Sequence, residues 1–190
     1  MKRENKIFNM VVTAVFAAVI AVGAFTSLRI ATIPFTLQSF AVFLALGTIG
    51  WKRGTVSVII YLLLGLVGAP VFSGFKSGAG VLFGPTGGFL TGFVFMGLVY
   101  GGVSRMLTKT SLPGLAVKIV SFLCGNIVLY VSGCLTYAFV YLKQVDIPSL
   151  TASFSACVLP FLLPDAVKLA VAAIISQQLE KLKIMKKYGI

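Results

Sequence analysis

Residues 7–25 read IFNMVVTAVFAAVIAVGAF, an apolar run without a charged side chain. A helix needs about 20 apolar residues to cross a bilayer, so this run has the length of one crossing. Further apolar runs follow at residues 37–50, 55–68, 88–107, 117–142 and 150–179. None alternates polar and apolar residues with period two, which favours helices over a barrel, the two structures that satisfy backbone groups in lipid. We expect an all-α integral membrane protein with six transmembrane helices in a single domain, residues 1–190.

The last apolar region is too long for one crossing. As a straight helix, residues 150–179 would measure about 45 Å at about 1.5 Å per residue, against a hydrocarbon core of about 30 Å. Pro160 and Pro164 should interrupt it, because proline lacks the N–H that a helix interior needs. A capping segment and a sixth helix kinked near these prolines are therefore expected.

The composition argues against other classes of protein. Only 11% of the residues are charged and the mean hydropathy is +1.05, whereas soluble domains carry about a quarter charged residues. This excludes a soluble globular enzyme. The formal charge is +12, but little water-exposed surface remains to bind nucleic acid. Without His, the commonest metal ligand and general base, neither a metal nor a cofactor is expected.

The basic residues predict the orientation in the membrane. With the N-terminus inside, three of them fall in outer segments: Arg29, Lys76 and Lys143. Twelve fall in inner segments: Lys2, Arg3, Lys6, Lys52, Arg53, Arg105, Lys109, Lys118, Lys181, Lys183, Lys186 and Lys187. Cytoplasmic segments are enriched in Lys and Arg. A multi-pass protein of the cell membrane with both termini in the cytoplasm is therefore predicted.

Asp165 and Lys168 stand out because they are charged within an apolar helix. They are three residues apart and so share a helix face. About 24 Å of helix separates Asp165 from Lys181, which places the pair in the outer part of the bilayer. Charges there are costly and usually mark a substrate path. Either the pair is self-neutralising and holds the kink, or Lys168 binds an anionic or carbonyl group while Asp165 accepts from an N–H donor.

A glycine-rich segment, residues 69–89, ends in Gly84-Pro85-Thr86-Gly87-Gly88-Phe89. Glycine permits close approach of the backbone to a ligand, and small residues four apart also permit close helix packing. Gly87 and Gly88 are candidates for either role. The segment is no phosphate-binding loop, because no Gly-Lys-Ser/Thr follows it. The chain by itself is therefore not expected to hydrolyse ATP.

Four polar residues lie at the start of the second apolar run or within the fifth. Thr36 and Gln38 open the second run, as ligand groups or as a helix cap and an interfacial amide. Asn126 and Tyr130 are four apart and face the same way, towards a ligand or towards another helix. Aromatic walls for a ligand could come from Phe72, Phe75, Phe83 and Phe89.

The first run carries small residues along one helical surface, namely Ala14, Ala17, Ala18 and Ala21. Small side chains let another helix approach closely. The stripe is interpreted either as internal packing or as a docking surface for a separate membrane subunit.

Three motifs and the charged pair together resemble the BioY family. They are IPFTLQ at residues 33–38, GLVGAPVF at residues 65–72, GPTGGF at residues 84–89, and Pro164-Asp165 with Lys168. BioY proteins are the biotin-specific substrate-capture (S) components of energy-coupling factor (ECF) transporters. The resemblance implies a six-helix bundle that holds biotin near its outer face. It also implies a transmembrane coupling protein and a pair of cytoplasmic ATPases as partners.

The resemblance assigns roles to individual residues. It implies that Asp165 and Lys168 bind biotin and that Ala14-xxx-Ala18 is the docking motif. Phe89 stands where the family often has Tyr, so a hydrogen bond from that hydroxyl is not expected here. The substrate-binding residues expected in all are Asp165, Lys168, Gln38, Thr36, Gly87, Gly88, Asn126, Tyr130 and Phe89.

Biotin fits these residues, because its ureido ring offers two N–H donors and a carbonyl, its thioether ring is apolar and its tail ends in a carboxylate.

Two alternatives keep the architecture, a capture component for another small vitamin and a self-sufficient facilitator. A facilitator would need a polar path through the inner half of the bundle, where few polar residues occur. An intramembrane enzyme with Asp165 as base lacks a second catalytic group at a recognisable spacing.

Overall fold

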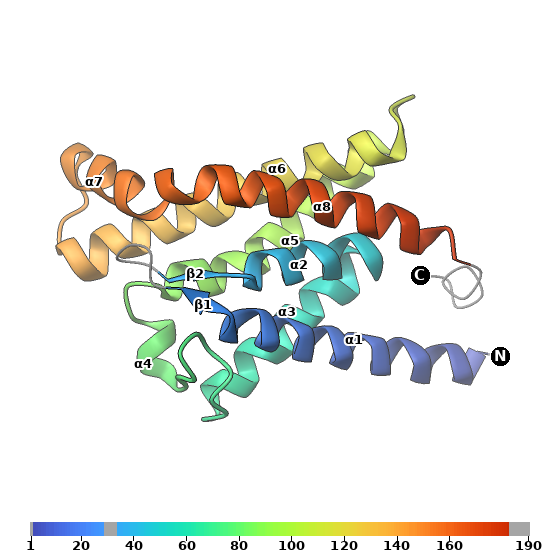
Figure 1. Ribbon diagram of the computed structural model, residues 1–190, viewed down its shortest axis with the longest axis horizontal. Coiled ribbons are helices and arrows are strands. Elements are labelled where there is room, and N and C mark those ends of the chain that lie inside the picture. The colour runs from blue at the N-terminus through green and yellow to red at the C-terminus, as the bar shows by residue number, and fades with distance from the viewer. Residues whose placement is uncertain (1, 29–33, 183–190) are drawn as a thin grey trace.

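The computed structural model describes residues 2–28 and 34–182, with side chains for residues 6–27 and 34–182. Its long helices run along one axis and form a bundle (Figure 1). In chain order the elements are α1 (Lys2–Phe25), β1 (Ser27–Leu28), β2 (Phe35–Thr36), α2 (Gln38–Thr48), α3 (Trp51–Leu66), α4 (Ala79–Leu82), α5 (Gly87–Leu107), α6 (Gly114–Tyr137), a π-helical turn (Ala138–Leu142), α7 (Ile147–Cys157), a 3₁₀ turn (Leu159–Phe161) and α8 (Leu162–Glu180).

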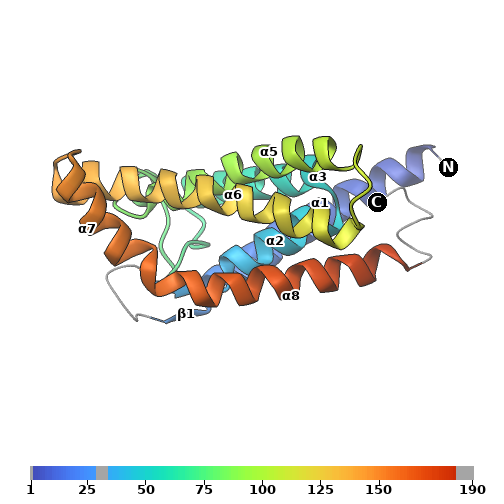
Figure 2. The same cartoon turned by 90° about the horizontal axis from the view of Figure 1, so that it is seen from above.

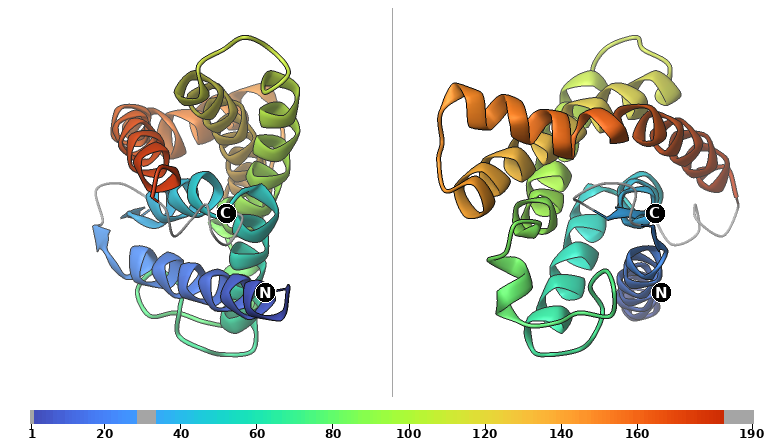
Figure 3. Two further views of the ribbon diagram at one scale, coloured as in Figure 1. Left: turned by 90° about the vertical axis from the view of Figure 1, so that its right-hand side faces the viewer. Right: turned by 60° about the vertical axis from the view of Figure 1, so that its left-hand side comes forward.

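The two ends of the bundle differ. One end carries the antiparallel pair β1–β2, together with α4 and α7, and is called the hairpin end below (Figure 1). At the other end α1 begins, α8 ends, and the α2–α3 and α5–α6 connections turn; it is called the terminal end (Figure 2). The view along the bundle shows the long helices grouped side by side (Figure 3).

The all-helical prediction is confirmed for the long runs, whereas the six crossings remain a prediction. Among the described residues, four segments are long and apolar enough to cross a membrane: Lys6–Phe25, Gly87–Leu107, Gly114–Leu142 and Ile147–Glu180. Helices α2 and α3, with 11 and 16 residues, are shorter. The hairpin β1–β2 and the short α4 have no counterpart in the periodicity of the sequence.

The break in the last region lies at Pro160. It falls in the 3₁₀ turn between α7 and α8, while Pro164 lies in the first turn of α8. A proline is tolerated there because first-turn N–H groups have no partner within the helix. Asp146 begins α7 by accepting the N–H of Ser149 at 2.8 Å. Hydrogen bonds from Ser149 hold the pKa of the Asp146 carboxyl below its usual value.

Lys118, counted above among the basic residues of the inner segments, is buried within a helix near the terminal end. It is in α6 and only 7% exposed. Its Nζ pairs with Glu180 Oε1 at 2.9 Å and donates to the Gly47 carbonyl at 3.1 Å and to Ser176 Oγ at 3.3 Å. A buried ammonium needs such partners, so Lys118 connects α6 to α2 and α8 at the terminal end.

The four alanines of α1 do not share one surface. Ala17 and Ala21 are buried in the core with Ile20 and Ala24, whereas Ala14 and Ala18 are exposed. Internal packing and an outward face therefore both occur, on different sides of α1.

Helices α5 and α6 approach closely through glycine. A Cβ at Gly88 would collide with Thr136 and with the carbonyl of Ser132. The close approach lets Ser132 Oγ donate to the Gly88 carbonyl at 2.8 Å. Gly88 therefore has the helix-packing role that the small-residue spacing allowed.

This packing predicts a position-specific loss of stability in α5. Gly88→Val should lower the unfolding temperature of the detergent-purified protein, because overpacking costs about 1–3 kcal/mol. Gly102→Val is the matched control, since Gly102 lies in the same helix and faces open space. Equal losses in the two variants would contradict the assignment.

Candidate functional site

A cavity of about 580 Å³ opens at the hairpin end. Its lining comes mainly from α2, α5, α6 and α8, from β2, and from the segment between α3 and α5, with single residues from β1, the π-helical turn, α7 and the 3₁₀ turn. The described residues place three charged side chains in this lining: Lys76, Asp165 and Lys168. The cavity therefore brings together segments that are more than 100 residues apart in the sequence.

Asp165 and Lys168 form a buried ion pair on one face of α8. Lys168 Nζ lies 2.9 Å from Asp165 Oδ1, and the residues are 8% and 6% exposed respectively. Lys168 also donates to the Thr36 carbonyl at 2.7 Å and to Ser39 Oγ at 3.1 Å. A lysine ammonium has three donors, so this geometry uses all of them. Lys168 Nζ also lies 4.0 Å from the centroid of the Phe35 ring.

The Asp165 carboxylate keeps acceptor capacity. It accepts from Lys168, from Ser39 Oγ at 3.2 Å and from the Tyr130 hydroxyl at 2.8 Å. A carboxylate offers about four lone-pair sites, so about one remains for a further donor. Asp165 also lies in the first turn of α8, where the helix dipole favours a negative charge. All three donors of the Lys168 ammonium are thus used, whereas the Asp165 carboxylate can still accept a hydrogen bond from a ligand.

Gln38 supplies a free donor to the same cavity. Its side chain is 4% exposed and lines the cavity, yet Nε2 has no hydrogen-bond partner among the described residues. A buried unpaired amide costs about 1–3 kcal/mol, and such groups in native structures call for an explanation. A ligand carbonyl would satisfy it. The interfacial interpretation of Gln38 is therefore wrong.

Six of the nine expected binding residues line this cavity: Thr36, Gln38, Phe89, Tyr130, Asp165 and Lys168. Thr36 contributes to the start of α2, because its Oγ1 accepts the N–H of Gln38 at 3.3 Å, although the flanking Leu37 makes no side-chain cap. Its carbonyl is the group that binds Lys168. Fixing this carbonyl is what the β1–β2 pair contributes to the site.

Gly87, Gly88 and Asn126 are not in the lining. The Cβ positions of Gly87 and Gly88 are occupied by Leu82 and by residues of α6. They allow α5 to begin where Phe89 reaches the cavity, while the preceding Gly84, Pro85 and Thr86 line it. Asn126 lies in a neighbouring apolar groove between α6, α7 and α8, which Tyr130 also lines.

The central residue that sequence reasoning missed is Ser39. It both donates to Asp165 and accepts from Lys168. The feature of the sequence that could have revealed Ser39 is that it is a third polar side chain close after Thr36 and Gln38 in an apolar run. Of the aromatic residues expected as walls, Phe72 and Phe89 line the cavity. Phe75 and Phe83 do not, being 67% and 78% exposed.

The geometry fits binding of a small polar-headed ligand. Walls from Phe72, Phe89, Leu90 and Phe93 surround one cluster of donors and acceptors. Pockets for small molecules are typically about 300–1,000 Å³ and mostly apolar, with a few placed polar groups. This cavity has that size and that distribution.

Comparisons with known proteins agree with this architecture. The model of the BioY family matches residues 1–184. The biotin transporter BioY of Thermotoga maritima is 37% identical over 93% of this chain and 98% of its own. The probable biotin transporter BioY of Pyrococcus horikoshii is 38% identical over 88% of this chain and 93% of its own.

The fold agrees with a solved structure as well. The crystal structure of the S-component for biotin from an ECF-type ABC transporter superposes with a TM-score of 0.84 and 26% identity, over 99% of this chain and 98% of that one. With a family match over nearly the whole length and a shared fold, this chain belongs to the BioY family.

Proposed function

We propose that the chain is the biotin-binding S component of an ATP-driven ECF importer and takes up biotin across the cell membrane. The observation that carries this proposal is the cavity at the hairpin end with the Asp165–Lys168–Ser39–Tyr130 cluster at its wall. The relatives named above are biotin transporters, which supports the choice of ligand. Such a chain is a transport component and not an enzyme.

The ureido ring of biotin matches the hydrogen-bond donor and acceptor that remain unused in the site. One ring N–H can donate to the remaining acceptor position of Asp165, and the ring carbonyl can accept from Gln38 Nε2. The thioether ring then lies among Phe72, Phe89 and Phe93. A hydrogen bond to a charged group contributes about 1.5–3 kcal/mol. Two or three such bonds with the buried rings are compatible with about −12 kcal/mol, a nanomolar affinity.

The proposed topology has six crossings, by α1, α2, α3, α5, α6 and α8, with both termini in the cytoplasm. Described basic residues at the terminal end are Lys6, Lys52, Arg53, Arg105, Lys109, Lys118 and Lys181, against Lys76 and Lys143 at the hairpin end. The positive-inside rule then puts the hairpin end outside. Trp51, with Arg105 4.5 Å from its ring centroid, supports an interface at the terminal end.

A self-sufficient facilitator is not supported by the packing below the cavity. Phe43 lies about one turn of α2 beyond Ser39 and is fully buried against Phe122, with 5.2 Å between ring centroids. Tyr100 stacks on Phe122 at 4.7 Å. These buried rings and the Lys118 cluster lie between the cavity and the terminal end, which disfavours an open path for biotin. We therefore expect transport to require the coupling partners.

The exposed Ala14 and Ala18 support α1 as the docking site for the transmembrane coupling protein, which carries the cytoplasmic ATPase pair. Exposed apolar side chains flank them, namely Val11, Val15 and Val22. Small residues on a lipid-facing stripe let a partner helix approach closely. Ala17 and Ala21 serve the interior of this chain and not the partner.

Asp165→Asn tests the ligand site. We expect biotin affinity, measured by isothermal titration in detergent, to fall by about two orders of magnitude, because a bond to a charged acceptor contributes about 1.5–3 kcal/mol and about 1.4 kcal/mol is tenfold. Lys168→Ala should also abolish tight binding. Asp146→Asn is the control, since Asp146 lies at the hairpin end outside the cavity. Unchanged affinity in folded Asp165→Asn would contradict the assignment.

Ala18→Leu tests the docking face. The larger side chain should block co-purification with the coupling module and biotin uptake in cells, while biotin binding by the isolated chain stays unchanged. Val19→Leu is the control, because Val19 is also exposed on α1 but lies about 100° around the helix from Ala18. Normal uptake by Ala18→Leu would show that docking uses another surface.

A further inference from the structure

Lys76 leaves the cavity with an uncompensated positive charge. Asp165 and Lys168 neutralise each other, and Lys76 is the third charged residue of the described lining. The side chain of Lys76 forms no ion pair with any residue that the structure describes. A cavity with this charge balance suits a ligand with one negative charge.

The backbone of Lys76 is held in a tight, anchored turn. Its carbonyl accepts the N–H of Phe72 at 3.0 Å, which closes a loop of five residues. Within the loop, Gly74 and Phe75 both have positive φ, 72° and 57°. For a residue other than glycine this conformation is strained and persists only where the surroundings enforce it.

Aromatic contacts on both sides of the loop hold its backbone in this conformation. Phe72 is buried and packs edge-on against Tyr61, with 5.6 Å between ring centroids. Phe75 stacks on Phe25 of α1 at 4.6 Å. The strained turn thus fixes the Cα of Lys76 at the cavity rim, and only the flexible side chain remains to adjust.

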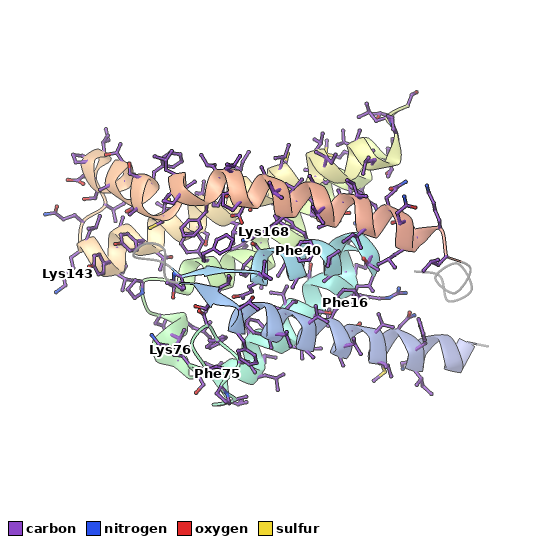
Figure 4. All side chains as sticks on the ribbon, viewed as in Figure 1. Phe16, Phe40, Phe75, Lys76, Lys143 and Lys168 are labelled. Atoms are coloured by element: carbon purple, nitrogen blue, oxygen red, sulfur yellow. The ribbon has the colours of Figure 1, made fainter. Side chains whose placement is uncertain are left out.

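Lys76 and Lys168 line the cavity from different parts of the bundle. Figure 4 shows Lys76 beside the segment that contains α4, whereas Lys168 lies between α8 and the start of α2. In Figure 3 the α4 segment and α8 are likewise on different sides of the bundle. A ligand bound in the cavity can therefore contact the charged cluster with one end and Lys76 with the other.

We infer that Lys76 binds the carboxylate of the biotin tail, with the ureido ring held at the Asp165 cluster; this rests on the proposed function. The reverse orientation is disfavoured for two reasons. All three donors of Lys168 are already used, and a carboxylate beside Asp165 would meet a like charge, which costs several kcal/mol when desolvated. Lys76 makes the site selective for the free acid over neutral derivatives.

The test compares biotin with biotinamide, whose tail is neutral, on wild type, Lys76→Gln and Lys76→Glu. Because exposed ion pairs contribute at most about 1 kcal/mol, Lys76→Gln should weaken biotin about threefold to fivefold and leave biotinamide nearly unchanged. Lys76→Glu should weaken biotin further. The differences should shrink at high salt, since the Debye length falls to about 3 Å at 1 M.

Lys143→Gln is the matched control, an exposed lysine at the hairpin end that does not line the cavity (Figure 4). It should bind both ligands as the wild type does. The inference about Lys76 would be overturned if Lys76→Gln weakened the binding of biotin and biotinamide equally, or weakened neither. Binding of biotin by the wild type would in that case still support the proposed function. Failure of the wild-type chain to bind biotin at all would overturn both.

Discussion

The cost of placing a carboxylate in a membrane is the constraint on which the rest of this structure depends. An isolated ion in an apolar medium loses its hydration, and breaking a buried pair by removing one partner costs about 3–5 kcal/mol. Asp165 is stabilised by Lys168, Ser39 and Tyr130, and Lys168 in turn by the Thr36 carbonyl. These partners come from α8, α2, α6 and β2. The site therefore also ties four elements together at the hairpin end.

A second buried cluster braces the same three helices at the terminal end. There Lys118 of α6 binds the Gly47 carbonyl of α2 together with Ser176 and Glu180 of α8. The fully buried Phe43 and Phe122 lie between the two clusters. The polar groups thus define the two ends of a packed apolar core. The hairpin-end cluster has an unused acceptor and faces a cavity, whereas Lys118 is 7% exposed and directs its three bonds to groups of the protein. This difference explains why one cluster can bind a ligand and the other serves structure.

The long helices and the charged pair could be predicted from sequence, because hydrophobic runs and rare intramembrane charges are local signals. Ser39, the hairpin and the burial of Lys118 could not, since each depends on segments that meet only in the fold. The GPTGGF motif has one property that could be predicted from sequence and one that could not. Its glycine spacing predicted close packing, which Gly88 confirms against Thr136, but which residues reach the cavity is determined by where α5 begins. Phe75 and Phe83 were misjudged because aromatic residues in a loop carry no periodicity that reveals their direction.

A crystal structure of the chain with biotin bound would test this arrangement of the site most directly. We predict one biotin in the hairpin-end cavity, with its ureido ring within hydrogen-bond distance of Asp165 and its carboxylate towards Lys76. Biotin bound outside this cavity, or bound with its carboxylate at the Asp165–Lys168 pair, would contradict it.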